Sequence, residues 1–384
     1  MREAEYRMWL CAAITDHAQR MRLLETFGSP EGIFYAGAER LAAEGGLTKT
    51  ESGRIESTCT DRYVTRIERE LNRLDARFVW HGEKHFPKCL REIPDPPLGI
   101  FYQGTLPTQR QCAVAIVGTR QSSPYGETVA YRFGRILGDS GVTVVSGLAM
   151  GIDVSSHRGA LDGGGITVAV LGSGIGTPYP LENVDTYREI TKKGCVMSEY
   201  GPGVPGLKHH FPNRNRLIAG LSDAVLVVEA KLRSGTMITV DRALDQGKAV
   251  FAIPGRITDE NSEGCHKLIK QGAQLVTDPG EILAVLREQL GGFALQTEDD
   301  GQLCLTSFDK ENEKKLKLTL ASEEKMVYAS LRLSPKSFDQ LVWESGLTPA
   351  VLLRTLYTLE QNGRIRQAAD GMYRAEEPGV ALRL

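Results

Sequence analysis

The sequence predicts an α/β protein built around a Rossmann-like, doubly wound and mostly parallel sheet. From Cys112 to about Leu290, short apolar runs rich in β-branched residues alternate with segments of helical apolar spacing, which is typical of parallel βαβ units. Several of these runs end in glycine-bearing loops. Because the carboxyl ends of parallel strands meet at one rim of a sheet, we expect a ligand-binding cleft at that rim.

The chain has 384 residues, more than the roughly 100 to 200 of one typical domain. We predict an N-terminal all-helical domain (1–78), a Rossmann-like core (79–290), a polar linker of mixed charge (291–318) and a C-terminal winged helix (319–384). No apolar run approaches the roughly 20 residues of a membrane span. The first residues are too charged for a signal peptide, so we expect a cytoplasmic protein that does not contact membranes.

The N-terminal domain shows apolar residues at helical spacing, including Trp9, Ile14 and Leu23. Short helices joined by glycine turns follow, and Thr48 is placed to cap one of them. This region weakly resembles a helix-hairpin-helix or SAM-like domain, which can grip a DNA backbone. Acidic and basic residues balance here, so a structural or protein-contact role is favoured. The stretch Phe78–Gly104 is rich in proline and aromatic residues and should wrap the edge of the core.

Six strands are expected in the core, with helices between them. The strands are 113–117, 142–147, 167–172, 195–199, 224–230 and 249–255, and the helices include 127–137, 155–164 and 239–247. In the C-terminal domain, 323–331, 337–346 and 348–363 read as helices and 365–374 as a hairpin, with Ser337 and Thr348 as caps. The third of these helices offers Arg354 and little other positive charge, so protein contact is at least as plausible as DNA reading.

The first predicted core strand leads into a loop suited to an anion. Gly118 begins the turn, and Thr119 and Arg120 lie just beyond the strand. The next helix would point its unpaired N–H groups at the same place, which favours phosphate. An ordinary strand-to-helix turn with a surface arginine is the alternative.

A second stretch, Leu207–Ile218, concentrates positive charge around one aromatic ring. No carboxylate occurs between Glu199 and Asp223, and Phe211 is surrounded in sequence by Lys208, His209, His210, Arg214 and Arg216. Single-stranded nucleic acid needs such a combination, because cations follow the phosphates while bases stack on the ring. The net charge of −2 means that such binding must come from a local patch. In the alternative interpretation, Phe211 fills the core and an arginine pairs with a carboxylate such as Glu229.

Enzyme and metal-site signatures are absent from the sequence. It contains no GxxxxGK[ST], HExxH or GxSxG motif, and its seven cysteines form no CxxC pair. A relay of Ser146, Asp153 and His157 is conceivable, although such groups more often cap a helix. We therefore expect no catalytic activity, no cofactor and no metal.

The motifs VGTRQSSPYG, VVSGLAMGIDVSSHRGAL, AVLGSGIGTPYP, FPNRNRLIAGLSDAVLVVEAKLRSGTMIT and VFAIPG closely resemble those of the DNA processing protein A (DprA/Smf) family. This resemblance implies a dimerising core that binds single-stranded DNA without sequence preference. It also implies that the protein protects incoming DNA in natural transformation and loads RecA recombinase in homologous recombination.

Carried over by position, the family's DNA pocket falls on Thr119, Arg120, Lys208, Phe211, Arg214, Asn215, Ser234 and Gly235. One departure is His266, which stands where the family pattern has asparagine. The rival class is a related Rossmann-like enzyme, a nucleoside monophosphate phosphoribohydrolase. Its glutamate has no counterpart after Gly235 and Thr236, where Val240 follows Thr239.

Overall fold

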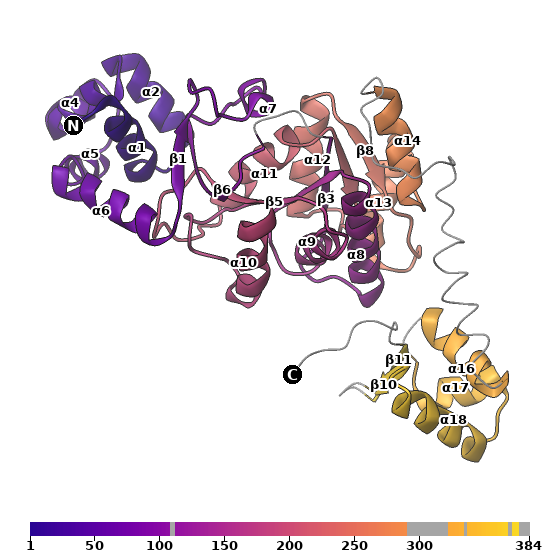
Figure 1. Cartoon of the computed structure of the whole chain (residues 1–384). Coiled ribbons are helices and arrows are strands. Elements are labelled where there is room, and N and C mark those ends of the chain that lie inside the picture. The colour runs from indigo at the N-terminus through magenta and orange to yellow at the C-terminus, as the bar shows by residue number, and fades with distance from the viewer. Residues whose placement is uncertain (108–111, 290–321, 334–335, 368–370, 376–384) are drawn as a thin grey trace. The chain divides into compact units, whose positions relative to one another are not determined.

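A computed structural model of the chain describes residues 1–107, 112–289, 322–333, 336–367 and 371–375 (Figure 1). The chain forms two compact units, Met1–Asp299 and Asp300–Leu384, and each is described by itself. Within the described ranges, none of the helices has the length and apolar character needed to cross a membrane. The linker expected at 291–318 lies outside the described residues.

The first unit begins with helices that pack around Trp9, Leu10 and Leu23, all fully buried. These helices are α1 (Glu3–Ala13), α2 (His17–Phe27), α3 (Pro30–Phe34), α4 (Gly37–Ala43), α5 (Lys49–Glu56) and α6 (Asp61–Arg73). The predicted cap at Thr48 is confirmed: its hydroxyl accepts from the Glu51 N–H, and the Glu51 carboxylate accepts from the Thr48 N–H at 2.9 Å. This reciprocal capping box satisfies two backbone donors that the start of α5 would otherwise leave unpaired.

A nine-stranded sheet follows, in the order β1-β2-β6-β5-β4-β3-β7-β8-β9. Its six predicted strands are confirmed as β3 (Ala113–Val117), β4 (Thr143–Ser146), β5 (Thr167–Val170), β6 (Cys195–Ser198), β7 (Ala224–Val227) and β8 (Ala249–Ala252), all parallel. They are buried along nearly their whole length, as strands covered on both faces must be.

Three strands were not predicted: β1 (Arg77–Trp80), β2 (Gly99–Gly104) and the two-residue β9 (Gln274–Leu275). β1 pairs antiparallel with β2, and β2 pairs antiparallel with β6, so the stretch expected to wrap the edge of the core instead extends the sheet there. The short helix α7 (Lys88–Arg91) lies between β1 and β2 in the sequence. Because β1 belongs to this sheet, the last two residues of the proposed helical domain already form part of the core's sheet.

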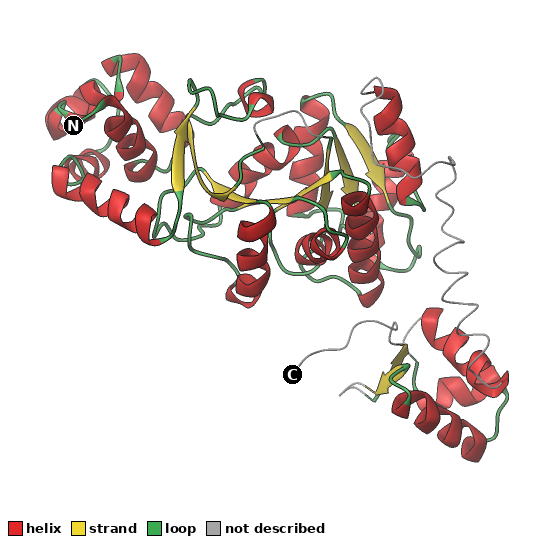
Figure 2. Ribbon diagram, viewed as in Figure 1, coloured by secondary structure: helices red, strands yellow, loops and turns green. Residues whose placement is uncertain are grey.

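Helices cover both faces of the sheet, which makes it doubly wound (Figure 2). One face packs against α8 (Pro124–Asp139), α9 (Ile152–Asp162) and α14 (Pro279–Gln289). The other packs against α11 (His210–Gly220), α12 (Gly235–Asp245) and α13 (Glu263–Lys270). α10 (Val184–Lys193) precedes β6, and single 3-10 turns occur at Leu181–Asn183 and Glu260–Ser262.

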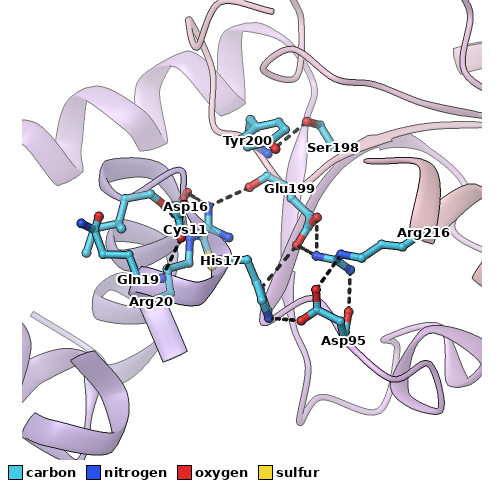
Figure 3. A network of polar contacts seen from close by, with 11 residues as sticks. Cys11, Asp16, His17, Gln19, Arg20, Asp95, Ser198, Glu199, Tyr200 and Arg216 are labelled. Atoms are coloured by element: carbon cyan, nitrogen blue, oxygen red, sulfur yellow. Dashed lines mark hydrogen bonds and ion pairs between the residues drawn. The ribbon is translucent and has the colours of Figure 1, made fainter. Parts of the chain in front are cut away.

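A buried ion-pair network joins α2 to the core (Figure 3). The Arg216 guanidinium lies 2.7 Å from the Glu199 carboxylate and 3.3 Å from that of Asp95, and His17 Nε2 lies 2.8 Å from Asp95. Arg20, which has no exposed surface, donates to the Glu199 carbonyl at 3.2 Å. Arg216 therefore pairs with Glu199, rather than with the Glu229 that sequence reasoning suggested, and ties α11 to the N-terminal helices.

The second unit is a winged helix, as predicted. It contains α16 (Ser322–Leu333), α17 (Phe338–Ser345), α18 (Pro349–Gln361) and an antiparallel hairpin of β10 (Ile365–Gln367) and β11 (Tyr373–Ala375). Ser337 caps α17 as expected, whereas Thr348 occupies the capping position of α18 without a side-chain hydrogen bond. Residues 368–370 of the predicted hairpin turn lie outside the described residues.

Candidate functional site

The carboxyl ends of the parallel strands bring three predicted site segments to one rim of the sheet. Arg120 follows β3, Phe211 lies in the first turn of α11 after β6, and Gly235 begins α12 after β7. More than one hundred residues separate Arg120 from Gly235 in the sequence, and the order of strands in the sheet brings them to the same rim.

Phe211 is the centre of this rim. The Arg120 guanidinium carbon lies 4.8 Å from the centroid of its ring, within the range of a cation–π contact. A Cβ placed on Gly172 would lie 2.7 Å from the ring, and one on Gly206 would lie 3.2 Å from it. The ring is half-buried. The Phe211 ring is therefore neither fully exposed nor part of the core, because the backbone at Gly172 and Gly206 packs against it and the exposed Arg120 lies over it.

The loop that carries Arg120 is held by Glu229. The Glu229 carboxylate accepts from the Ser123 N–H at 3.0 Å and from the Ser123 hydroxyl, and the Glu229 carbonyl accepts from the Thr119 N–H at 2.8 Å. Gly126 is required beside it, since a Cβ there would lie 2.4 Å from the carboxylate. Sequence reasoning weighed Glu229 only as a partner for an arginine. Glu229 lies at the carboxyl end of a predicted parallel strand, and a carboxylate at that position lies next to the loop after the neighbouring strand. Its role in holding the Arg120 loop could have been predicted from this position.

The cations of the rim are available to a ligand. Arg120 and Lys208 are exposed, and within the described part of the chain neither is paired with a carboxylate. Arg214 behaves differently: it is 5% exposed, and its guanidinium donates to the Val170 carbonyl and, at 3.1 Å, to Asn215 Oδ1. Burial lowers the pKa of Arg214 to about 10, while the nearby Asp153 carboxylate favours its charged form.

Asn215 also faces inward. Its side chain is largely buried and donates to the Gly235 carbonyl at 3.1 Å, so it links α11 to the start of α12. In this structure, Arg214 joins α11 to the end of β5 and Asn215 joins α11 to α12, so neither side chain projects from the rim. A direct contact of either residue with DNA stays a prediction.

The start of α12 offers backbone donors. Gly235 is exposed, no acidic residue lies in the first turn, and Ser234 Oγ is buried with no hydrogen-bond partner among the described residues. Such a terminus favours an anion, because its N–H groups are unpaired and its dipole end is positive.

The conceivable relay of Ser146, Asp153 and His157 is incomplete, because His157 bonds Thr167 and not the Asp153 carboxylate. Ser146 Oγ donates to the Ile116 carbonyl at 2.6 Å, and Asp153 accepts from the Gly147 and Ala149 N–H groups at 3.2 and 3.3 Å. His157 Nδ1 bonds Thr167 Oγ1 at 2.6 Å in the interior. These groups satisfy buried polar atoms of the loop after β4 and of the neighbouring strands. In the described ranges no three His, Cys, Asp or Glu residues form a cluster that could hold a metal.

His266, the departure from the family pattern, has a structural role. Its Nε2 lies 3.0 Å from the Gly255 carbonyl, so the ring holds the loop after β8. An asparagine amide could donate to the same carbonyl.

These features define a Rossmann-like α/β protein that has a winged-helix domain and a sheet rim bearing cations and an aromatic ring. The chain belongs to the DNA processing protein A family: residues 77–287 match the model of DNA recombination-mediator protein A, and residues 311–371 match the DprA winged helix domain. The DNA processing protein DprA of Streptococcus pneumoniae is 47% identical over 199 residues, which is 52% of this chain and 70% of that protein.

Solved structures agree with this assignment. The X-ray structure of DprA from Streptococcus pneumoniae has a TM-score of 0.62 and 36% identity, and covers 73% of this chain and 97% of that one. DprA from Helicobacter pylori, described for its single-stranded DNA binding mode, has a TM-score of 0.51 and 29% identity, and covers 56% of this chain and 96% of that one.

Proposed function

We propose that this chain binds single-stranded DNA without sequence preference, protects it, and loads RecA on it in the cytoplasm. The observation that supports this most is the contact of Arg120 with the half-buried ring of Phe211, beside the exposed Lys208. The Helicobacter pylori relative, which binds single-stranded DNA, adds support.

The chemistry of the rim favours single strands over duplex. A base can stack on an aromatic ring only when it is unpaired and turned outward, as in a single strand. The cations recognise phosphates, which are the same in every sequence, and a ring face accepts any base. Binding of this kind has little sequence preference.

Fluorescence anisotropy of labelled single strands and duplexes over a range of salt tests the proposal. We expect Arg120→Ala and Lys208→Ala to weaken binding to all sequences and to flatten the salt dependence by about 0.7 in log–log slope per lost phosphate contact. Arg40→Ala is the matched control, since Arg40 is an exposed arginine of α4 paired with Glu44. Parent-like binding by both site variants would show that the pocket is misplaced.

We further propose that the chain has no catalytic activity and uses no cofactor. The engagement of His157 with Thr167 instead of Asp153 supports this, as does the absence of a glutamate after Thr239 for phosphoribohydrolase chemistry. Nucleotide or nucleoside monophosphate hydrolysis by the pure protein, lost on Asp153→Ala, would favour the enzyme instead.

The proposed partners are RecA and a second copy of this chain through the Rossmann-like domain. Family membership supports both, and the short strand β9 supports the second because it ends the sheet with Leu275 44% exposed. Sedimentation of the parent and of Leu275→Arg tests the dimer. RecA filament formation on strands coated with single-strand binding protein, with and without this chain, tests loading.

A further inference from the structure

We propose that Tyr179 is a second base-stacking platform beside Phe211, so that the rim holds two neighbouring bases of one strand. This inference rests on the proposed single-strand binding and adds a subsite to it. Tyr179 lies in the loop after β5, its side chain is 52% exposed, and its ring centroid is 5.7 Å from that of Phe211. The contact between the two rings places the exposed ring of Tyr179 next to Phe211, on which we propose that one base stacks.

Other exposed aromatic residues of the first unit have different surroundings. Tyr35 packs against Tyr6 and Phe34, and its hydroxyl lies 2.9 Å from that of Tyr6. Tyr125 donates its hydroxyl to the Pro254 carbonyl at 3.3 Å. Among the described residues, Tyr179 thus combines exposure with a direct contact to Phe211.

The loop that presents Tyr179 is held in place before any ligand arrives. Ser173 Oγ donates to the Thr177 carbonyl at 2.6 Å, and the Thr177 N–H donates to the Gly174 carbonyl at 3.0 Å. After the tyrosine, Asn183 Nδ2 donates to the Leu148 carbonyl at 3.0 Å. A ring on a held loop loses little conformational freedom when a base stacks on it, so most of the stacking energy remains available for binding.

The distribution of charge separates the path of the phosphates from that of the bases. The loop of Tyr179, residues 177–183, contains no cation and carries the exposed Glu182. The cations come from other loops, with Arg120 after β3 and Lys208 before α11. Phosphates are therefore drawn to Arg120 and Lys208, while Tyr179 offers its ring face and an uncharged hydroxyl.

The relative orientation of the rings bears on the bound strand. The planes of Tyr179 and Phe211 are inclined by 44°. Two bases lying flat on these rings cannot be stacked on each other, so the strand must turn between them. In duplex DNA neighbouring bases stay stacked on each other, so they cannot stack on Tyr179 and Phe211 at the same time.

The test compares two labelled strands of equal length, oligothymidylate and an abasic strand that has the same phosphates without bases. We expect Tyr179→Ala to weaken oligothymidylate binding by roughly 5- to 150-fold, the range for loss of one stacked base. Binding of the abasic strand and the salt slope should not change, because no phosphate contact is lost. Tyr179→Phe should bind like the parent.

Tyr35→Ala is the matched control, because Tyr35 is an exposed tyrosine, 68%, that follows α3 among the N-terminal helices and is no part of the rim. It should bind both strands like the parent. Parent-like oligothymidylate binding by Tyr179→Ala, an equal loss on the abasic strand, or an equal loss in Tyr35→Ala would each overturn the second platform. If Arg120→Ala still weakens binding to both strands, the proposed function survives that result, whereas a parent that binds neither strand refutes both.

Discussion

Phe211 has two roles, because one part of its ring rests on glycine backbone and another contacts Arg120. We expect Phe211→Ala to reduce single-strand affinity by about 1 to 3 kcal/mol with little change in salt slope. We also expect a loss of stability, smaller than the roughly 3 to 5 kcal/mol of a fully buried phenylalanine. Anisotropy and urea unfolding on the same sample measure both.

The matched variant Phe211→Trp keeps a stacking ring and should bind at least as well as the parent. A destabilised Phe211→Ala whose folded fraction binds like the parent would contradict stacking. The site would then be electrostatic, based on Arg120 and Lys208.

His157 should make the fold sensitive to acid. Burial lowers its pKa to about 3, far below the ordinary value of about 6.5 that it regains on unfolding. As pH falls, the unfolded state takes up the proton first, so stability present above about pH 6.5 is lost progressively toward pH 3. Between pH 6.5 and 5, this residue alone should lower the free energy of unfolding by about 2 kcal/mol.

The variant His157→Leu removes this titration, while Thr167 Oγ1 keeps its bond to the Val144 carbonyl. Urea unfolding at pH 7 and pH 5 measures the free energy of unfolding of both proteins. The decrease from pH 7 to pH 5 should be smaller in the variant than in the parent, by about 2 kcal/mol. The exposed His85→Gln serves as the control. Equal pH dependence in parent and His157→Leu would mean that the fold does not lower the pKa of His157.

The helix α11 depends on the pair that fixes it to the core. The side chains of Arg216 and Glu199 are 5% and 4% exposed, so removing Arg216 leaves the Glu199 carboxylate buried with only the His17 ring beside it, at 3.9 Å. We expect Arg216→Ala to lower the free energy of unfolding by about 3 to 5 kcal/mol. Urea unfolding measures this loss, with Arg40→Ala as the control, because the Arg40–Glu44 pair is solvent-exposed and contributes little to stability.

The double variant Arg216→Met, Glu199→Leu separates the pair's own contribution from the cost of an unpaired charge. It should be more stable than Arg216→Ala, because no buried charge is left without a partner. A double variant that is less stable than the single one would indicate that the pair itself stabilises the fold strongly. Loss of DNA binding in proportion to unfolding would show that the network supports α11 without contacting DNA.

For the whole chain, we predict that the winged helix is dispensable for single-strand binding. Its helix α18 offers Arg354, which lies 3.6 Å from the Glu323 carboxylate, and apolar Leu353 and Tyr357 are exposed on the same helix. Cutting the chain near Gly291, at the proposed domain boundary, should leave affinity within about a factor of ten, or about 1.4 kcal/mol.

Anisotropy with the same labelled strand compares the truncated and full chains. A larger loss would show that the C-terminal unit contributes to the site. A preserved single-strand affinity together with a lost response of RecA would instead assign the winged helix to protein contact.

Much of the fold could be predicted because its signals are local. The six parallel strands are continuous apolar runs, and the caps at Thr48 and Ser337 act within four residues of the chain. Strands β1 and β2 were not predicted, because the segment between them is rich in proline and because β2 pairs with β6, more than ninety residues further on. β9 is too short to leave a pattern, since two residues show no period.

The sequence alone also located the rim, since charge and aromatic content select Arg120, Lys208 and Phe211 without coordinates. It could not show that Arg214 and Asn215 face inward, because polar residues in the first turns of a helix usually signal exposure. Their burial depends on the Val170 carbonyl and the start of α12, which only the assembled sheet brings to them. A residue's type and neighbours determine which interactions it can make, and contacts between distant segments determine which of them it does make.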